Sequence, residues 1–200
     1  GLDDLFTEEP AVRDDLIQVF KEAVTAYNVD GFRIDTVKHV NQEFWRKFAP
    51  ELTDYAAAQG KPNFFMFGEV YSGNEQLMSF YPTALNASGP DLQAVLDFGF
   101  QSAARNFASA NGASDNLRTF FEKDDWFIDE NSSAAQLPTF LGNHDMGRIG
   151  YFLKSDNAGA DDAELLARDK LAHELMLFSR GIPVVYYGDE QGFTGTGGDK

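Results

Sequence analysis

The sequence contains no cysteine among its 200 residues, so disulfide bonds, thiolate catalysis and cysteine-ligated zinc are all excluded. Basic residues are also scarce, because 16 Lys and Arg face 32 Asp and Glu, which gives a formal net charge of −16. Such an acidic chain repels phosphate backbones and anionic lipids. We therefore expect no nucleic acid and no membrane as partner, and a neutral or cationic ligand fits better.

Long apolar runs are missing as well. No segment approaches the roughly 18 consecutive apolar residues of a membrane-spanning helix. The chain opens with neither a methionine nor a signal-peptide pattern, so we expect the true start to lie upstream. We expect a secreted protein, although the lack of cysteine is equally compatible with the cytoplasm. With 43% apolar and 14% aromatic residues, the chain can form the core of one globular domain or part of one.

What the sequence does contain is a strand followed by a helix, repeated along the chain. Short apolar runs predict strands at 29–35, 64–67, 94–98, 137–141 and 183–187. Helical spacing of apolar residues predicts helices at 11–27, 44–58, 102–121 and 163–179. Strands joined by helical crossovers imply a parallel sheet, either an open sheet or a barrel.

Two features favour the barrel. No Gly-x-Gly-x-x-Gly turn follows any predicted strand, and polar residues gather at the C-terminal ends of several strands, where a (β/α)8 TIM barrel builds its active site. A complete barrel has eight strands and about 250 residues. We therefore predict that residues 1–200 form the C-terminal portion of such a barrel, about strands 4 to 8, while an open sheet stays the alternative.

Three carboxylates, Asp35, Glu69 and Asp145, follow the ends of predicted strands. Glycoside hydrolysis needs one carboxylate as nucleophile and one as proton donor, about 5–5.5 Å apart when the anomeric configuration is retained. Arg33, on the same strand face as Asp35, would hold that aspartate ionised, so Asp35 is the predicted nucleophile. Glu69 follows a run of apolar residues, and a desolvated carboxyl holds its proton more readily, so Glu69 is the predicted general acid.

Other polar positions have simpler explanations. A single Asp or Glu after a strand is commonly a cap for the next helix, and only the set of three points to chemistry. We expect a structural role for Asp97, which has no chemical neighbour, and for His173, which lies within a helix. Tyr71, just past Glu69, is a candidate platform for stacking a sugar ring.

Four segments resemble motifs of the α-amylase superfamily of glycoside hydrolases. In chain order, GFRIDTVKH (31–39), FGEV (67–70), FLGNHD (140–145) and GIPVVYYGDE (181–190) are similar to the motifs of its fourth, fifth, seventh and eighth barrel strands. The resemblance covers nearly the whole chain. It implies that Asp35 is the nucleophile, Glu69 the acid/base, and Asp145 the residue that holds sugar hydroxyls and stabilises the transition state.

The resemblance also implies binding roles. Arg33 and His144 would assist the carboxylates, and Lys38 and His39 match positions that contact the sugar on the leaving-group side, a pair typical of α-amylases. The segment LDDL (2–5) looks like a short additional motif, in which Asp4 and the backbone carbonyl of His39 can ligate a structural calcium.

The implied activity is retaining hydrolysis of α-1,4-glucosidic bonds in starch or maltooligosaccharides. Three alternatives stay open within the superfamily: an α-glucosidase, a glucanotransferase, and a non-catalytic glucan-binding relative. The run Gly142-Asn143-His144-Asp145 alone also resembles a motif of binuclear metallophosphoesterases, which need further metal ligands. The third-strand motif and the C-terminal β domain of the superfamily are absent, so we expect the isolated 200 residues to be inactive and to self-associate through exposed strand edges.

Overall fold

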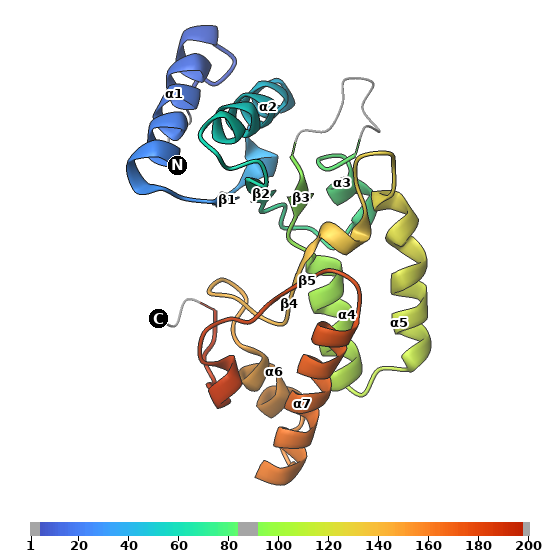
Figure 1. The fold of residues 1–200 in the computed structure, drawn as a ribbon. Coiled ribbons are helices and arrows are strands. Elements are labelled where there is room, and N and C mark those ends of the chain that lie inside the picture. The colour runs from blue at the N-terminus through green and yellow to red at the C-terminus, as the bar shows by residue number, and fades with distance from the viewer. Residues whose placement is uncertain (1–4, 84–91, 198–200) are drawn as a thin grey trace. The chain divides into compact units, whose positions relative to one another are not determined.

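The computed structural model describes residues 5–83 and 92–197 as an α/β fold with helices and parallel strands (Figure 1). The chain divides into two compact units. The first unit contains Gly1–Tyr71, Leu77–Val95 and Asp129–Ser132, and the second contains Ser72–Gln76, Leu96–Ile128 and Ser133–Lys200. No helix within the described ranges is both long enough and apolar enough to span a bilayer.

The first unit is built on a three-stranded parallel sheet. Its strands are β1 (Gly31–Ile34), β2 (Phe65–Gly68) and β3 (Ala94–Val95), hydrogen-bonded in that order. Two helices belong to it, α1 (Pro10–Tyr27) and α2 (Gln42–Ala58), and a 3-10 turn spans Val37–His39. The short helix α3 (Glu75–Ser79) follows β2 along the chain.

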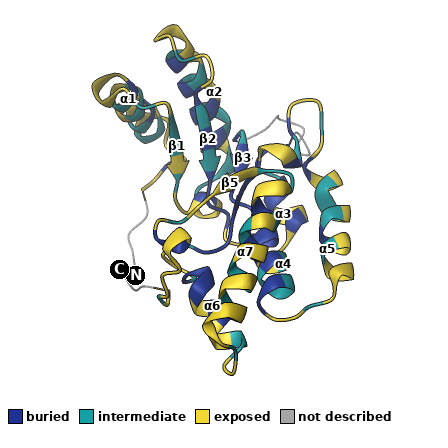
Figure 2. Ribbon diagram, turned by 60° about the horizontal axis from the view of Figure 1, so that its bottom comes forward, coloured by how far each residue is buried: buried dark blue, intermediate teal, exposed yellow. Residues whose placement is uncertain are grey.

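Sequence explains the limits of α1 and the packing of α2. Pro10 occupies the first position of α1, where its missing N–H costs nothing, and Asn28 ends the helix in the left-handed conformation with φ 52°. Helix α2 continues through Pro50 and buries one side, as Figure 2 shows. Its buried residues are Phe44, Trp45, Phe48, Ala49, Leu52 and Ala56.

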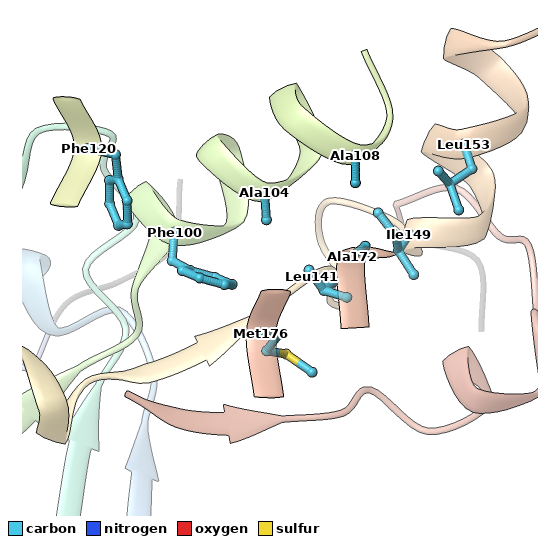
Figure 3. Packing of buried hydrophobic residues seen from close by; sticks show 9 residues of the cluster. All are labelled: Phe100, Ala104, Ala108, Phe120, Leu141, Ile149, Leu153, Ala172 and Met176. Atoms are coloured by element: carbon cyan, nitrogen blue, oxygen red, sulfur yellow. The ribbon is translucent and has the colours of Figure 1, made fainter. Parts of the chain in front are cut away.

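The second unit pairs a two-stranded parallel sheet with four helices. Its strands are β4 (Pro138–Phe140) and β5 (Ile182–Val184), and its helices are α4 (Phe98–Ala108), α5 (Ser114–Phe121), α6 (Ile149–Asp156) and α7 (Asp162–Phe178). A core of aromatic, aliphatic and small side chains joins α4, α6 and α7 (Figure 3). Its buried members are Phe100, Ala104, Ala108, Phe120, Leu141, Ile149, Leu153, Ala172 and Met176.

The structure refines one expectation and corrects another. The helical material expected from 102 to 121 is present as two helices, α4 and α5, with the left-handed residue Asn111 (φ 57°) between them. The strand expected at 94–98 ends at Val95, because Asp97 caps α4 by accepting a hydrogen bond from the Phe100 N–H at 2.8 Å. Helix α6 was not predicted at all.

Candidate active site

Two of the predicted carboxylates lie just beyond neighbouring strands of the first unit. The register of β1 and β2 pairs Ile34 with Gly68, so Asp35 and Glu69 are the next residues on their respective strands. The ladder continues around them, because Glu69 N donates to Ile34 O at 2.7 Å and Val37 N donates to Glu69 O at 3.0 Å. The carboxyl-terminal edge of the sheet therefore brings the two carboxylates together.

Arg33 lies between these carboxylates. Alternation along β1 places Arg33 on the same face as Asp35, and its Nη1 donates a hydrogen bond to Asp35 Oδ1. Its Nη2 lies 3.5 Å from Glu69 Oε2. The two acids differ in exposure, because the Asp35 side chain is 64% exposed and that of Glu69 is 8% exposed. One guanidinium therefore contacts an open carboxylate and a buried one.

The buried carboxyl of Glu69 is held by the loop that follows β1. The backbone N–H of Thr36, which has φ 51°, donates to Glu69 Oε2 at 3.2 Å. Gly68 allows this close approach: a Cβ there would lie 2.6 Å from Val37 Cγ2 and 2.7 Å from Leu92 Cδ1. Any larger residue at position 68 would displace the buried side chains of Val37 and Leu92.

The predicted binding residues of the first unit lie on the same two loops. Lys38 Nζ donates to the Tyr71 carbonyl at 2.9 Å, which ties the loop after β1 to the loop after β2. The side chains of Lys38, His39 and Tyr71 are exposed. His39 is the last residue of the 3-10 turn, whereas its predicted calcium co-ligand, Asp4, lies outside the described residues.

In the second unit, His144 and Asp145 occupy a tight turn that runs from Asn143 to Gly147. His144 Nε2 lies 3.3 Å from Asp145 Oδ2, and both side chains are at least half exposed. Asn143 Oδ1 accepts from the N–H groups of Asp145 at 3.0 Å and Met146 at 2.8 Å, and Gly147 closes the turn with φ 102°. This positioning function of Asn143 was missed, although an Asn ahead of such a turn is a recognisable signal.

The two residues expected to be structural are both tied into the second unit. Asp97 caps α4 and forms a buried ion pair with Arg180, which also pairs with Asp124. His173 lies inside α7, and its Nδ1 is 2.9 Å from the Asp169 carbonyl oxygen. Over residues 5–83 and 92–197, no three His, Asp or Glu side chains form a group that could hold a metal ion.

Comparison with known proteins identifies the family. The family described as alpha amylase, catalytic domain, matches residues 1–199. The chain belongs to this α-amylase family. The α-amylase of Streptomyces lividans is 52% identical over 200 residues, which are 100% of this chain and 21% of the relative. A cyclomaltodextrin glucanotransferase of Klebsiella oxytoca is 28% identical over 183 residues, covering 81% of this chain and 26% of the relative.

Solved structures of α-amylases share the fold. An α-amylase of Anoxybacillus superposes with a TM-score of 0.82 at 29% identity, covering 98% of this chain and 40% of that one. The α-amylase of Geobacillus thermoleovorans complexed with acarbose gives a TM-score of 0.81 at 29% identity, with the same coverage of 98% and 40%. The chain thus spans 21% of its Streptomyces relative and 40% of each of these solved α-amylases.

Proposed function

We propose that the full-length protein carrying this chain is a retaining glycoside hydrolase that cleaves α-1,4-glucosidic bonds in starch or maltooligosaccharides. One observation carries the proposal: Arg33 contacts both Asp35 and Glu69, which follow adjacent strands in register. Neighbouring strands are about 4.8 Å apart. That spacing is close to the carboxyl separation of about 5–5.5 Å in retaining enzymes.

In the first step, the Asp35 carboxylate attacks the anomeric carbon while Glu69 donates a proton to the glycosidic oxygen, and the C–O bond to the leaving sugar breaks. The Arg33 guanidinium favours the ionised, nucleophilic form of Asp35. The Thr36 N–H fixes one oxygen of Glu69, which leaves the other oxygen to carry the transferred proton. The products are a covalent glycosyl–Asp35 ester and a released oligosaccharide.

In the second step, Glu69 removes a proton from water as the water oxygen attacks the anomeric carbon and the bond to Asp35 breaks. Two inversions give net retention. Asp145, with His144 beside it, would hold sugar hydroxyls and stabilise the positively charged transition state. Lys38 and His39, which present exposed side chains on the loop after β1, would bind the sugar on the leaving-group side. The exposed ring of Tyr71, on the loop after β2, would stack on a sugar ring.

A glucanotransferase is the second candidate, because a relative with that name is 28% identical over 81% of this chain. If a sugar hydroxyl replaces water in the second step, the same carboxylates transfer the glycosyl group instead of hydrolysing it. The product distribution separates the two, since transfer yields oligosaccharides longer than the substrate.

We also propose that the five strands are strands 4 to 8 of a (β/α)8 barrel, with residues 1–200 as its C-terminal portion. Apolar surface in the second unit supports this. All three residues of β5 are exposed, and α7 buries only Ala172 and Met176 (Figure 2). Further chain would cover such surfaces in a complete barrel. We expect the isolated 200 residues to be inactive and to self-associate through them, and secretion stays a prediction.

A structural calcium at Asp4 and His39 is a further part of the proposal. Thr7 Oγ1 donates to Asn41 Oδ1 at 2.7 Å, so the segment shortly after Asp4 lies against the segment shortly after His39. Carboxylate and carbonyl oxygens suit calcium, which would stabilise this part of the fold. Chelation should lower the melting temperature of the full-length protein, and Asp4→Asn should remove that difference. An unchanged melting temperature on chelation would rule the site out.

The role of Glu69 can be tested separately from that of Asp35. Glu69→Gln should lower kcat/KM on maltoheptaose by several orders of magnitude but far less on α-maltosyl fluoride, because fluoride departs without a proton and kcat/KM covers only the steps that form the covalent ester. Glu43→Gln, in an exposed position on α2, is the matched control and should leave both rates unchanged. Equal losses of Glu69→Gln on both substrates would contradict its assignment as the acid.

A further inference from the structure

We propose that Arg148 is the positioning residue of Asp145, acting through a buried ion pair with Asp189. The inference rests on the proposed function of Asp145. All of these residues belong to the second unit. Arg148 follows Asp145 by three residues and comes directly after the turn, Asn143 to Gly147, that carries it.

The backbone of Arg148 is fixed from both sides. Its N–H donates to Gly195 O at 3.0 Å, and its carbonyl accepts from the N–H groups of Tyr151 at 3.1 Å and Phe152 at 3.3 Å as the cap of α6. Arg148 is therefore the point where the Asp145 turn joins a rigid helix. Any displacement of Arg148 moves the turn with it.

The side chain of Arg148 is anchored in the interior. The residue is 8% exposed, and its Nη1 donates to Tyr187 O at 2.5 Å and to Asp189 Oδ1 at 3.0 Å. The guanidinium carbon also lies 4.3 Å, 4.8 Å and 5.6 Å from the ring centroids of Tyr186, Tyr187 and Phe193. Asp189 is 2% exposed. Arginine can donate hydrogen bonds and stack on aromatic rings at the same time, because its guanidinium is planar. The ammonium group of lysine cannot make both kinds of contact in this way.

The segment at 187–197, which contains the partners of the Arg148 side chain, also contacts the Asp145 turn directly. Gly147 forms an antiparallel bridge with Thr196, and a Cβ on Gly197 would collide with the carbonyl oxygen of Asp145. Asp189 starts the 3-10 turn of this segment, where its N–H donates to Tyr186 O at 3.0 Å. The Arg148–Asp189 pair therefore clamps the segment at 187–197 against the turn, and the position of Asp145 depends on that clamp.

Catalysis is sensitive to such positioning, because a displacement of about 1 Å can cost a hundredfold in rate. Arg148 itself needs no contact with substrate for this effect. If it acts only by placing Asp145, its substitution should matter when Asp145 is intact and should cease to matter when the Asp145 carboxylate is removed. A general loss of structure would lower the rate equally in both cases.

The experiment measures kcat/KM of the full-length protein on α-maltosyl fluoride, whose activated leaving group keeps slow variants measurable. The variants are Arg148→Lys and Asp189→Asn, each made alone and in combination with Asp145→Asn. Enzyme concentrations are normalised to the amplitude of the thermal unfolding transition, so that only folded protein is counted. Arg180→Lys, another buried arginine of this unit that pairs with Asp97 and Asp124, is the matched control.

When Asp145 is intact, we expect Arg148→Lys to lower kcat/KM about ten- to hundredfold. In the Asp145→Asn background, we expect the same substitution to lower kcat/KM less than about threefold. Arg180→Lys should lower the melting temperature without changing kcat/KM in either background. An equal fold-loss for Arg148→Lys in both backgrounds would overturn the inference alone. If Asp145→Asn leaves kcat/KM unchanged, the proposed role of Asp145 fails first. Should Arg148→Lys not fold, Asp189→Asn must show the same dependence on Asp145.

Discussion

The backbone N–H of Thr36 donates a hydrogen bond to Oε2 of Glu69 at 3.2 Å, and Thr36 does so from the left-handed conformation with φ 51°. Left-handed geometry is unfavourable for a β-branched residue. The strain therefore lies one residue after the predicted nucleophile, and it turns a backbone donor toward the predicted acid. Strain of this kind persists where the surroundings enforce it, and it clusters at functional sites.

Thr36→Asn should raise the stability of the protein by about 1 kcal/mol, because asparagine tolerates the left-handed conformation and keeps the N–H donor. Thr36→Val is the matched variant, since it retains β-branching and therefore the strain. Thermal unfolding of both variants provides the measurement. A melting temperature of Thr36→Asn at or below that of Thr36→Val would show that the backbone at this position is not strained.

Replacing Arg33 with Met should lower kcat/KM by about a hundredfold or more, because two neighbouring carboxylates lose the cation that contacts both. Without that cation the nucleophile takes up a proton more readily, so the acid limb of the pH–rate profile should move to higher pH. Arg33→Lys keeps a positive charge, so it should lose less kcat/KM and shift the acid limb less than Arg33→Met. An acid limb that stays in place in Arg33→Met would separate Arg33 from the ionisation of Asp35.

Arg180→Met should destabilise the protein by about 3–5 kcal/mol, because Asp97 would remain buried without its counter-ion. Adding Asp97→Asn should recover part of the loss, since the uncompensated charge is then gone. Arg118→Met removes an exposed arginine from its pairs with Asp115 and Glu122 and should cost less than about 1 kcal/mol. Similar losses of unfolding free energy for Arg180→Met and Arg118→Met would show that the burial of the Arg180–Asp97 pair does not determine its contribution to stability.

His173 should make stability depend on pH. The Asp169 carboxylate, whose Oδ1 lies 3.4 Å from His173 Nδ1, raises the pKa of His173 above its usual value together with the Asp169 carbonyl, and partial burial opposes this. A raised folded-state pKa stabilises the protein fully below the unfolded-state value, and the stabilisation disappears as pH rises through the folded-state value. The melting temperature of the wild type should exceed that of His173→Gln by more at pH 5.5 than at pH 8.5. A difference that grows with pH would have the wrong sign.

The pairing of Asp35 with Glu69 was predictable because parallel strands end at one edge of a sheet, so local patterns alone place both residues there. The break between α4 and α5, within the helical material expected at 102–121, was missed although the sequence carries a signal for it. Asn111-Gly112 is a pair typical of turns, and Asn111 takes the left-handed conformation that interrupts the helical run.

Arg148 and Asn143 escaped prediction for different physical reasons. The partners of the Arg148 side chain, Tyr187 and Asp189, lie 39 and 41 positions away in the sequence. The sequence around Arg148 therefore does not predict that its side chain is buried. Asn143 acts locally, and its place ahead of the turn is a signal that was overlooked in the sequence. Sequence patterns thus predicted the charged groups of the candidate site, and the structure added residues that hold them in place.

The most direct test of the account follows the stereochemistry of hydrolysis. Full-length wild-type protein and its Asp35→Asn variant would each be given maltoheptaose, and NMR would record the anomeric protons of the new reducing ends before mutarotation. Retention through Asp35 predicts an α-anomer as first product and a loss of activity by several orders of magnitude in Asp35→Asn. A β-anomer as first product, or an Asp35→Asn variant of undiminished activity, would contradict the mechanism.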